Sequence, residues 1–94
     1  MERDNQIGEA AALKRITRLA LDGLAFAPIG SALPVAEVEA MRDLIPDLRA
    51  TGGYVVDEVE GLAFDAAGDL LVVTDDDGTD DSSGETVLLR LGAL

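Results

Sequence analysis

The chain has 94 residues with 19 acidic and 7 basic side chains, which gives a net charge of −12. It contains no cysteine and no histidine, so disulfides, thiolate metal sites and histidine-activated nucleophiles are excluded. The negative charge argues against nucleic acid and anionic membranes as partners and favours cations. No apolar run approaches the roughly 20 residues that span a bilayer. The charged start after Met1 does not resemble a signal peptide.

The first third of the chain predicts one regular element, a turn and a loop. Apolar and polar residues alternate over residues 17–21, which is typical of a strand. Residues 10–21 also contain good helix formers, so a helix is an open alternative. Asp22-Gly23 predicts a turn, and residues 24–34, with two prolines and a glycine, predict a loop.

Residues 35–48 carry the periodicity of an amphipathic helix. The apolar positions are Val35, Val38, Met41, Leu44, Ile45 and Leu48. Pro46 argues against an unbroken helix, because an interior proline removes a hydrogen bond and clashes with the preceding turn. The pattern therefore predicts a helix that ends or kinks near Leu44, before the break at residues 51–53.

The last third predicts three strands. Residues 59–64, 70–74 and 86–91 are rich in apolar residues, and residues 65–68 form a turn with a late glycine. Three consecutive strands with short connections make an antiparallel meander. The order strand, turn, strand, acidic loop, strand is also typical of one four-stranded propeller blade. The predicted fold is mainly β.

The loop at residues 75–85 carries five aspartates and one glutamate. Packed carboxylates must be solvated or share a cation, and Ca²⁺ is the hard cation that suits them. The loop is not an EF-hand, because Gly78 at the required glycine position puts Val73 where the first aspartate belongs. A solvated surface loop with an Asp-Gly turn is the plain alternative. Asp75, directly after a strand, and Glu60, at the start of the neighbouring one, favour a cation site.

The sequence also resembles a known family, described as the esterase-like activity of phytase. The resemblance lies in Glu2-Arg3-Asp4-Asn5 with Lys14-Arg15, in Leu44–Leu48 with Gly52-Gly53-Tyr54, in Val59–Gly68, in Leu71–Gly78, and in Ser83–Thr86 with Leu89–Gly92. These segments follow the order of the family and cover essentially the whole chain. Asp76 departs from the family pattern, which more often has asparagine there.

The resemblance implies a piece of a larger fold. Members are similar to β-propellers, are several times longer, are usually exported, and are described as phytase-like phosphoester hydrolases. The chain then corresponds to the last one or two blades, with residues 1–50 as the end of one blade and its connection and residues 51–94 as the final blade. The family also implies an outer strand over residues 35–43 and a short helix near 45–50, in place of the helix that periodicity predicts.

The resemblance further implies which residues form a site. Glu2, Arg3, Asp4 and Lys14 match a charged group of the family. Arg3, Lys14 and Glu60 are the candidate catalytic residues, and Glu60, Asp75 and Asp77 the candidate Ca²⁺ ligands. Each has a plain alternative: Arg3 and Lys14 as surface ion pairs, Glu60 as a solvated strand residue, and Asp77-Gly78 as a turn.

Two hypotheses follow. In the first, the chain is the C-terminal part of a phosphoester hydrolase domain that acts on a small phosphoester and is inactive alone. In the second, it is a non-catalytic acidic module that binds calcium or pairs its open strand edges with another chain or another copy of itself.

Overall fold

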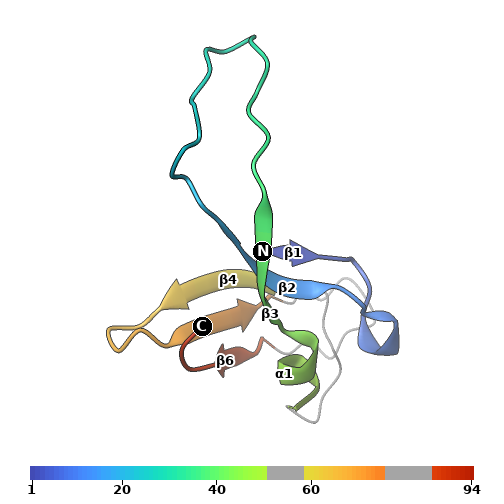
Figure 1. Ribbon diagram of the computed structural model, residues 1–94. Coiled ribbons are helices and arrows are strands. Elements are labelled where there is room, and N and C mark those ends of the chain that lie inside the picture. Colours follow the sequence, from blue (N-terminus) through green and yellow to red (C-terminus); the bar gives the residue numbers. More distant parts are fainter. Residues whose placement is uncertain (51–58, 76–85) are drawn as a thin grey trace.

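The computed structural model describes residues 1–50, 59–75 and 86–94. They form two three-stranded antiparallel sheets and one short α-helix (Figure 1). The first sheet, in the order β1-β2-β3, consists of β1 (Glu2–Arg3), β2 (Lys14–Leu19) and β3 (Val38–Asp43). The second, in the order β4-β5-β6, consists of β4 (Val59–Phe64), β5 (Leu70–Thr74) and β6 (Leu88–Arg90). Helix α1 (Ile45–Ala50) follows β3, and a 3₁₀ turn, η1 (Gly8–Ala10), lies between β1 and β2.

The second sheet confirms the predicted meander. β4 and β5 have the predicted bounds, and β6 lies within the predicted third strand. The turn between β4 and β5 is fixed by Asp65, whose carboxylate accepts hydrogen bonds from the backbone N–H groups of Ala67 and Asp69. Gly68 has φ = +85°, a conformation that suits glycine. Arg90 of β6 reaches across to ion pairs with Asp65 and Asp69 at 2.7 and 2.9 Å.

Residues 14–19 form a strand. Of the two alternatives for this part of the chain, the strand is right and the helix is wrong. The strand begins at Lys14, three residues before the predicted start. Lys14 and Ile16 are both buried and share one face, as the two-residue period of a strand requires. A β-bulge interrupts the pairing with β3 between Ile16 and Thr17.

The predicted helix over residues 35–48 is wrong, and the strand-then-helix order that the family implies is right. The helical spacing combines residues of two separate elements: Met41 packs on the core from β3, whereas Ile45 and Leu48 are the buried residues of α1. Pro46 lies in the first turn of α1, where its missing N–H costs nothing. The Ile45 N–H donates to Oδ1 of Asp43 at 3.0 Å, which ends the strand and begins the helix.

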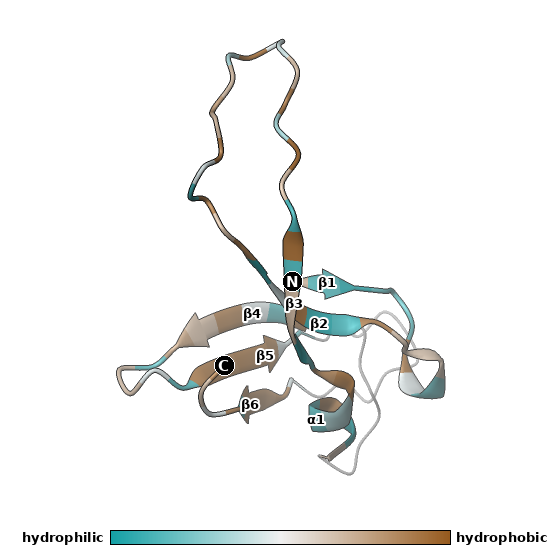
Figure 2. Cartoon of the chain, viewed as in Figure 1, coloured by the Kyte–Doolittle hydropathy of each residue, from teal (hydrophilic) through white to brown (hydrophobic). Residues whose placement is uncertain are grey.

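The core lies between the two sheets and α1, and Figure 2 shows β5 as a largely apolar strand. Its buried members are Ala11, Ile16, Leu44, Leu48, Val59, Leu70 and Val72. Leu44 and Leu70 are fully buried. This core is small for the part of the chain that the structure describes.

A long connection, residues 20–37, joins β2 to β3 and extends away from both sheets (Figure 1). We call it the arm. It contains the predicted turn at Gly23, with φ = +80°, and the predicted proline-containing loop. Its large apolar side chains are exposed, and Ile29 is as open as in an extended chain, at 105%.

The described residues form sheets of three strands, whereas a propeller blade has four. No propeller is formed by this part of the chain. None of its helices is long and apolar enough to cross a bilayer.

Candidate charged site between the sheets

The two sheets are joined by an ion pair between Arg3 of β1 and Glu60 of β4. Nη2 of Arg3 lies 2.9 Å from Oε1 of Glu60, and the two side chains are 31% and 47% exposed. Register explains the position of Arg3, because Arg3 lies directly opposite Lys14 and so projects from the core face of the first sheet. The structure therefore brings together two of the three candidate catalytic residues, which lie 57 positions apart in sequence.

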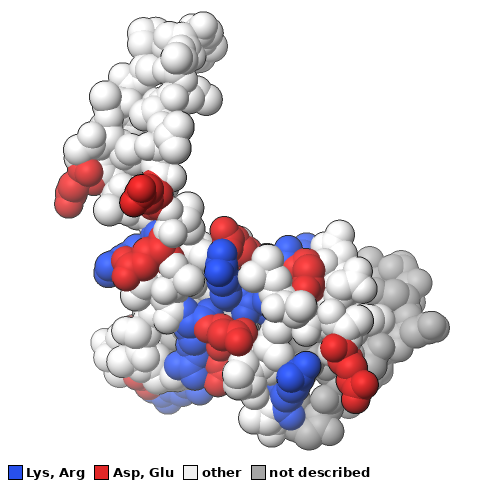
Figure 3. All heavy atoms as spheres, turned by 45° about the vertical axis from the view of Figure 1, so that its right-hand side comes forward, with Lys and Arg blue, Asp and Glu red and all other residues white. Residues whose placement is uncertain are grey.

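Glu2 projects from the opposite face of the first sheet. It lies opposite Arg15, which in turn lies opposite Asp43. The guanidinium of Arg15 donates to the Glu2 carboxylate. These three side chains form a charged row on the outer face, and Figure 3 shows acidic and basic side chains interleaved on the body of the molecule. Glu2 is thus separated from Arg3 and is not part of the site at Glu60.

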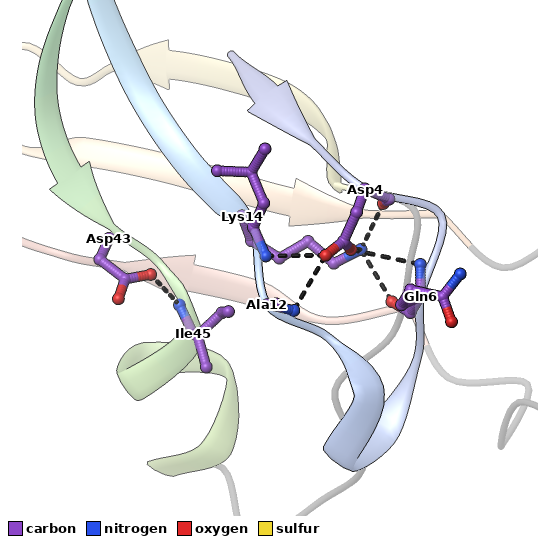
Figure 4. Close-up of polar contacts among 7 residues, drawn as sticks. Asp4, Gln6, Ala12, Lys14, Asp43 and Ile45 are labelled. Carbon is purple, nitrogen blue, oxygen red and sulfur yellow. Dashed lines mark hydrogen bonds and ion pairs between the residues drawn. The ribbon is translucent and has the colours of Figure 1, made fainter.

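Asp4 organises the segment between β1 and β2 (Figure 4). Its carboxylate accepts hydrogen bonds from the backbone N–H groups of Ala12 at 2.9 Å, Leu13 at 2.8 Å and Gln6 at 3.2 Å. Nζ of Lys14 lies 3.0 Å from Oδ1 of the same carboxylate. The hydrogen bond from Ala12 and then that from Lys14 hold the pKa of Asp4 far below its ordinary value. Asp4 is therefore ionised and fully engaged in holding the loop.

Lys14 is a buried lysine with no exposed side-chain surface. Its ammonium donates to the backbone oxygen of Asp4 at 2.7 Å, to Oδ1 of Asp4 at 3.0 Å and to the backbone oxygen of Gln6 at 2.9 Å. A lysine ammonium has three hydrogens, so these acceptors match its donors. The geometry gives Lys14 a role in shaping the loop that follows Arg3.

Two of the candidate calcium ligands flank one end of the second sheet. Val59 pairs with Thr74 at that end of the antiparallel β4-β5 pair, and Glu60 follows Val59 into β4, whereas Asp75 follows Thr74 out of β5. Asp75 is exposed. Asp77, the third candidate, lies outside the described residues, as does most of the acidic loop. Within the described ranges, no group of three or more acidic side chains is arranged to hold a metal ion.

Arg42 is a structural residue that sequence reasoning missed. Its Nε and Nη2 donate to the two carboxylate oxygens of Asp47, each at 2.8 Å, and Nη1 donates to the backbone oxygen of Leu91 at 3.1 Å. The hydrogen bond with Asp47 raises the pKa of Arg42. One side chain thus ties β3 to α1 and to the end of the second sheet. The sequence signal for this contact was Pro46. It lies in the first turn of α1 and so places Asp47 within reach of Arg42.

A hollow of about 330 Å³ also went unpredicted. It lies along β2 and β3 and is lined by residues 12–15 and 40–43. Its basic residues, Lys14, Arg15 and Arg42, are already paired with Asp4, Glu2 and Asp47. The adjacent basic pair Lys14-Arg15 was the only sequence signal that pointed to it.

The fold and the site define a small β-protein with a charged seam between two sheets. A family model described as Phytase-like, the esterase-like activity of phytase, matches residues 1–78. The chain belongs to this family. All the candidate catalytic and metal-binding residues fall within the matched range. No curated protein and no solved structure matches the chain.

Proposed function

We propose that the chain is a segment of a phytase-like phosphoester hydrolase domain, and that its two sheets correspond to the last one or two blades of a β-propeller. Residues 1–50 would be the end of one blade and its connection, and residues 51–94 the final blade. Family membership supports the proposal, as does the β4-β5-β6 meander, which has the strand order of a blade lacking its fourth strand. Among the described residues, β4 and β6 are the two edges of this sheet, and further strands would pair there.

The observation that carries the chemistry is the Arg3–Glu60 ion pair. Both side chains are partly exposed, and pairs of this kind contribute only about 0–1 kcal/mol to stability. An incoming phosphate would therefore compete with Glu60 for Arg3. Arginine suits the task, because its planar guanidinium binds two oxygens of a phosphate at once. Lys14 would support Arg3 by holding the loop that follows it, and would not contact the phosphate itself.

Calcium is the proposed cofactor, held by Glu60 and Asp75 together with Asp77. The two described carboxylates fit in part: they flank one end of one strand pair, but Ca²⁺ takes about 6–8 oxygen ligands. The remaining ligands would come from the acidic loop. When bound there, calcium would polarise a phosphoryl oxygen and orient water. Glu60, once released from Arg3, would be the side chain shared between the phosphate and the cation.

Titration with inorganic phosphate tests the role of Arg3 directly. Isothermal calorimetry of the chain, with calcium present, is expected to show binding that Arg3→Gln weakens by roughly tenfold, the loss of one charged hydrogen-bonding group. Arg18→Gln is the matched control, because Arg18 pairs with Glu39 in a separate exposed contact. Equal binding by both variants would contradict the assignment.

Turnover is a separate test. We expect no hydrolysis of p-nitrophenyl phosphate or p-nitrophenyl acetate by the isolated chain, with calcium or with a chelator, because two sheets do not close a propeller. Calcium-dependent turnover would contradict the proposal that the segment is inactive alone. The DNA upstream of the Met1 codon gives an independent check, since an open frame encoding more strands would support a larger domain.

The exposed apolar arm favours a second candidate function, an interaction module. In this reading the acidic loop binds calcium or stays solvated, and apolar surfaces of the chain bind a partner. A calcium titration followed by circular dichroism separates the readings: a gain of β-structure without hydrolysis supports the module.

A further inference from the structure

The arm carries an aspartate-glycine pair, Asp22-Gly23, shortly after β2 ends at Leu19 (Figure 1). In such a pair the backbone nitrogen of the glycine is able to attack the side-chain carboxyl carbon of the aspartate, because glycine has no Cβ that would crowd its nitrogen. In a folded protein the attack depends on two conditions. The carboxyl group must not be held by other groups, and the backbone must be open enough to rotate.

The carboxylate of Asp22 is the least restrained of those that the structure describes. The other described aspartates are engaged in hydrogen bonds, ion pairs or further electrostatic contacts: Asp4, Asp43, Asp47, Asp65, Asp69 and Asp75. Within the described ranges, no hydrogen bond or ion pair involves the side chain of Asp22, and both Asp22 and Gly23 are exposed. The carboxyl group of Asp22 is therefore available for reaction.

The backbone at Asp22 is lightly held. The N–H group of Leu24 donates to the backbone oxygen of Leu21 at 3.2 Å, which closes a turn with Asp22 and Gly23 at its centre. Gly23 has φ = +80°, as the third position of a type II turn requires. The pairing of β2 with β3 ends before the arm begins, so no described strand fixes this turn. Rotation of the Asp22 backbone then brings the Gly23 nitrogen against the side chain at the loss of one hydrogen bond.

We propose that Asp22 is a site of spontaneous isoaspartate formation in the folded chain. In the first step the backbone nitrogen of Gly23 forms a bond to Cγ of Asp22, and the hydroxyl of the carboxyl group leaves with the amide proton as water. The product is a five-membered succinimide ring. In the second step water adds to one of the two ring carbonyl carbons, and the bond from that carbon to nitrogen breaks. Opening at the side-chain carbon restores aspartate, whereas opening at the backbone carbon gives isoaspartate.

This modification alters the arm and leaves the core in place. Isoaspartate routes the main chain through the side-chain carbon and so adds one carbon atom to the backbone at position 22. The hydrogen bond between Leu24 and Leu21 would then have to close a larger ring, so the turn loses its geometry. None of the buried core residues that the structure describes lies in the arm. The two sheets therefore keep their packing while the arm changes direction.

Ageing of the purified chain at neutral pH tests the proposal. Trypsin cuts after Arg18 and Arg42 and releases a peptide of residues 19–42, in which Asp22 is the only aspartate and asparagine is absent. We expect a second form of this peptide to accumulate with time. It has the same mass, separates on reversed-phase chromatography and resists the endoproteinase that cuts before aspartate, and a minor form lighter by one water accompanies it. Circular dichroism of the aged chain verifies that the reaction is measured in the folded protein.

A synthetic peptide of residues 19–42 is the reference for an unfolded arm. Because the turn is exposed and lightly held, we expect the folded chain to isomerise at a rate within severalfold of that peptide. An Asp22 that stays intact in the folded chain while the peptide isomerises would overturn the proposal.

Two variants and one internal control identify the reacting groups. Gly23→Ala is expected to slow the reaction severalfold, because its Cβ crowds the attacking nitrogen. A Cβ there would meet nothing within 4 Å, so the strain of a positive φ falls on the arm alone. Asp22→Glu is expected to abolish the product, since the attack would have to close a six-membered ring. Asp65, which the backbone N–H groups of Ala67 and Asp69 hold, should stay aspartate.

An unchanged rate in Gly23→Ala, or equal isomerisation at Asp65 and Asp22, would also overturn the proposal. The other aspartate-glycine pair, Asp77-Gly78, lies outside the described residues and falls in a different tryptic peptide, residues 50–90. It therefore does not interfere with the measurement at Asp22. None of these outcomes bears on phosphate binding by Arg3, so this proposal and the proposed function fail independently.

Discussion

Nζ of Lys14 lies 3.0 Å from Oδ1 of Asp4, and the lysine side chain has no exposed surface. This contact gives a structural role to two members of the charged group that the family resemblance implies. The pair closes the loop between β1 and β2 and leaves Arg3, on the same face as Lys14, as the basic group that reaches the seam between the sheets.

Lys14→Met is expected to destabilise the protein by about 2–4 kcal/mol, because the backbone oxygens of Asp4 and Gln6 lose their donor. Urea unfolding followed by circular dichroism measures the change. Arg18→Met is the matched control: its exposed pair with Glu39 is worth about 0–1 kcal/mol. Equal effects of the two substitutions would show that burial of Lys14 does not matter to stability.

Acid is expected to weaken the fold through Asp4 and Asp65, whose pKa values are both lowered in the folded state. The main causes are backbone hydrogen bonds, from Ala12 to Asp4 and from Asp69 to Asp65. A carboxyl with a depressed pKa stabilises the fold above its unfolded pKa, and that contribution is lost as the pH falls through the folded pKa. The free energy of unfolding should therefore decline as the pH drops below the ordinary value of 3.8.

Urea unfolding over a series of acidic pH values tests this dependence. Asp4→Asn should be less stable near neutral pH and should lose less stability on acidification. An unchanged acid dependence in that variant would show that Asp4 is not the group responsible.

Gly61→Ala is expected to cost about 1–3 kcal/mol, the usual effect of overpacking a well-packed position. The added Cβ would lie 2.3 Å from Val73 Cγ1, and the β-branched valine is stiff at χ1. The double variant with Val73→Ala should recover part of the loss in a double-mutant cycle. Strictly additive effects would contradict the close approach of these two residues.

The Arg3–Glu60 pair is expected to show a coupling energy below about 1 kcal/mol in a double-mutant cycle of Arg3→Gln and Glu60→Gln. The coupling should shrink further when salt is added, since both side chains are partly exposed. A large, salt-insensitive coupling would mean that the pair holds the sheets together and is not available to a phosphate.

The sequence predicted the second sheet well because its signals are local. Apolar runs gave the bounds of β4 and β5, and Gly68 marked the turn between them. The first sheet was harder, because β3 is largely exposed and pairs with β2 across the arm. The few apolar residues of β3, taken together with those of α1, are spaced as in a single helix. The pairing of β3 with β2 overrides that local pattern.

The candidate site was predictable only in part. The acidic and basic residues were identified, but no local pattern indicates that Arg3 meets Glu60, because that contact depends on how two sheets pack. The burial of Lys14 did have a signal. Lys14 and Ile16 are two residues apart on one strand, so an apolar Ile16 on the core face places Lys14 there too.

The length of the arm has a consequence for the order of folding. Pairing of β2 with β3 must close residues 20–37, whereas pairing of β4 with β5 closes only residues 65–69. Loop-closure entropy grows with the logarithm of length, which makes the longer closure costlier by about 1 kcal/mol. The β4-β5 hairpin should therefore form first and offer Val59, Leu70 and Val72 as a template on which the first sheet condenses. Shortening the arm should speed folding while leaving the rate of unfolding nearly unchanged.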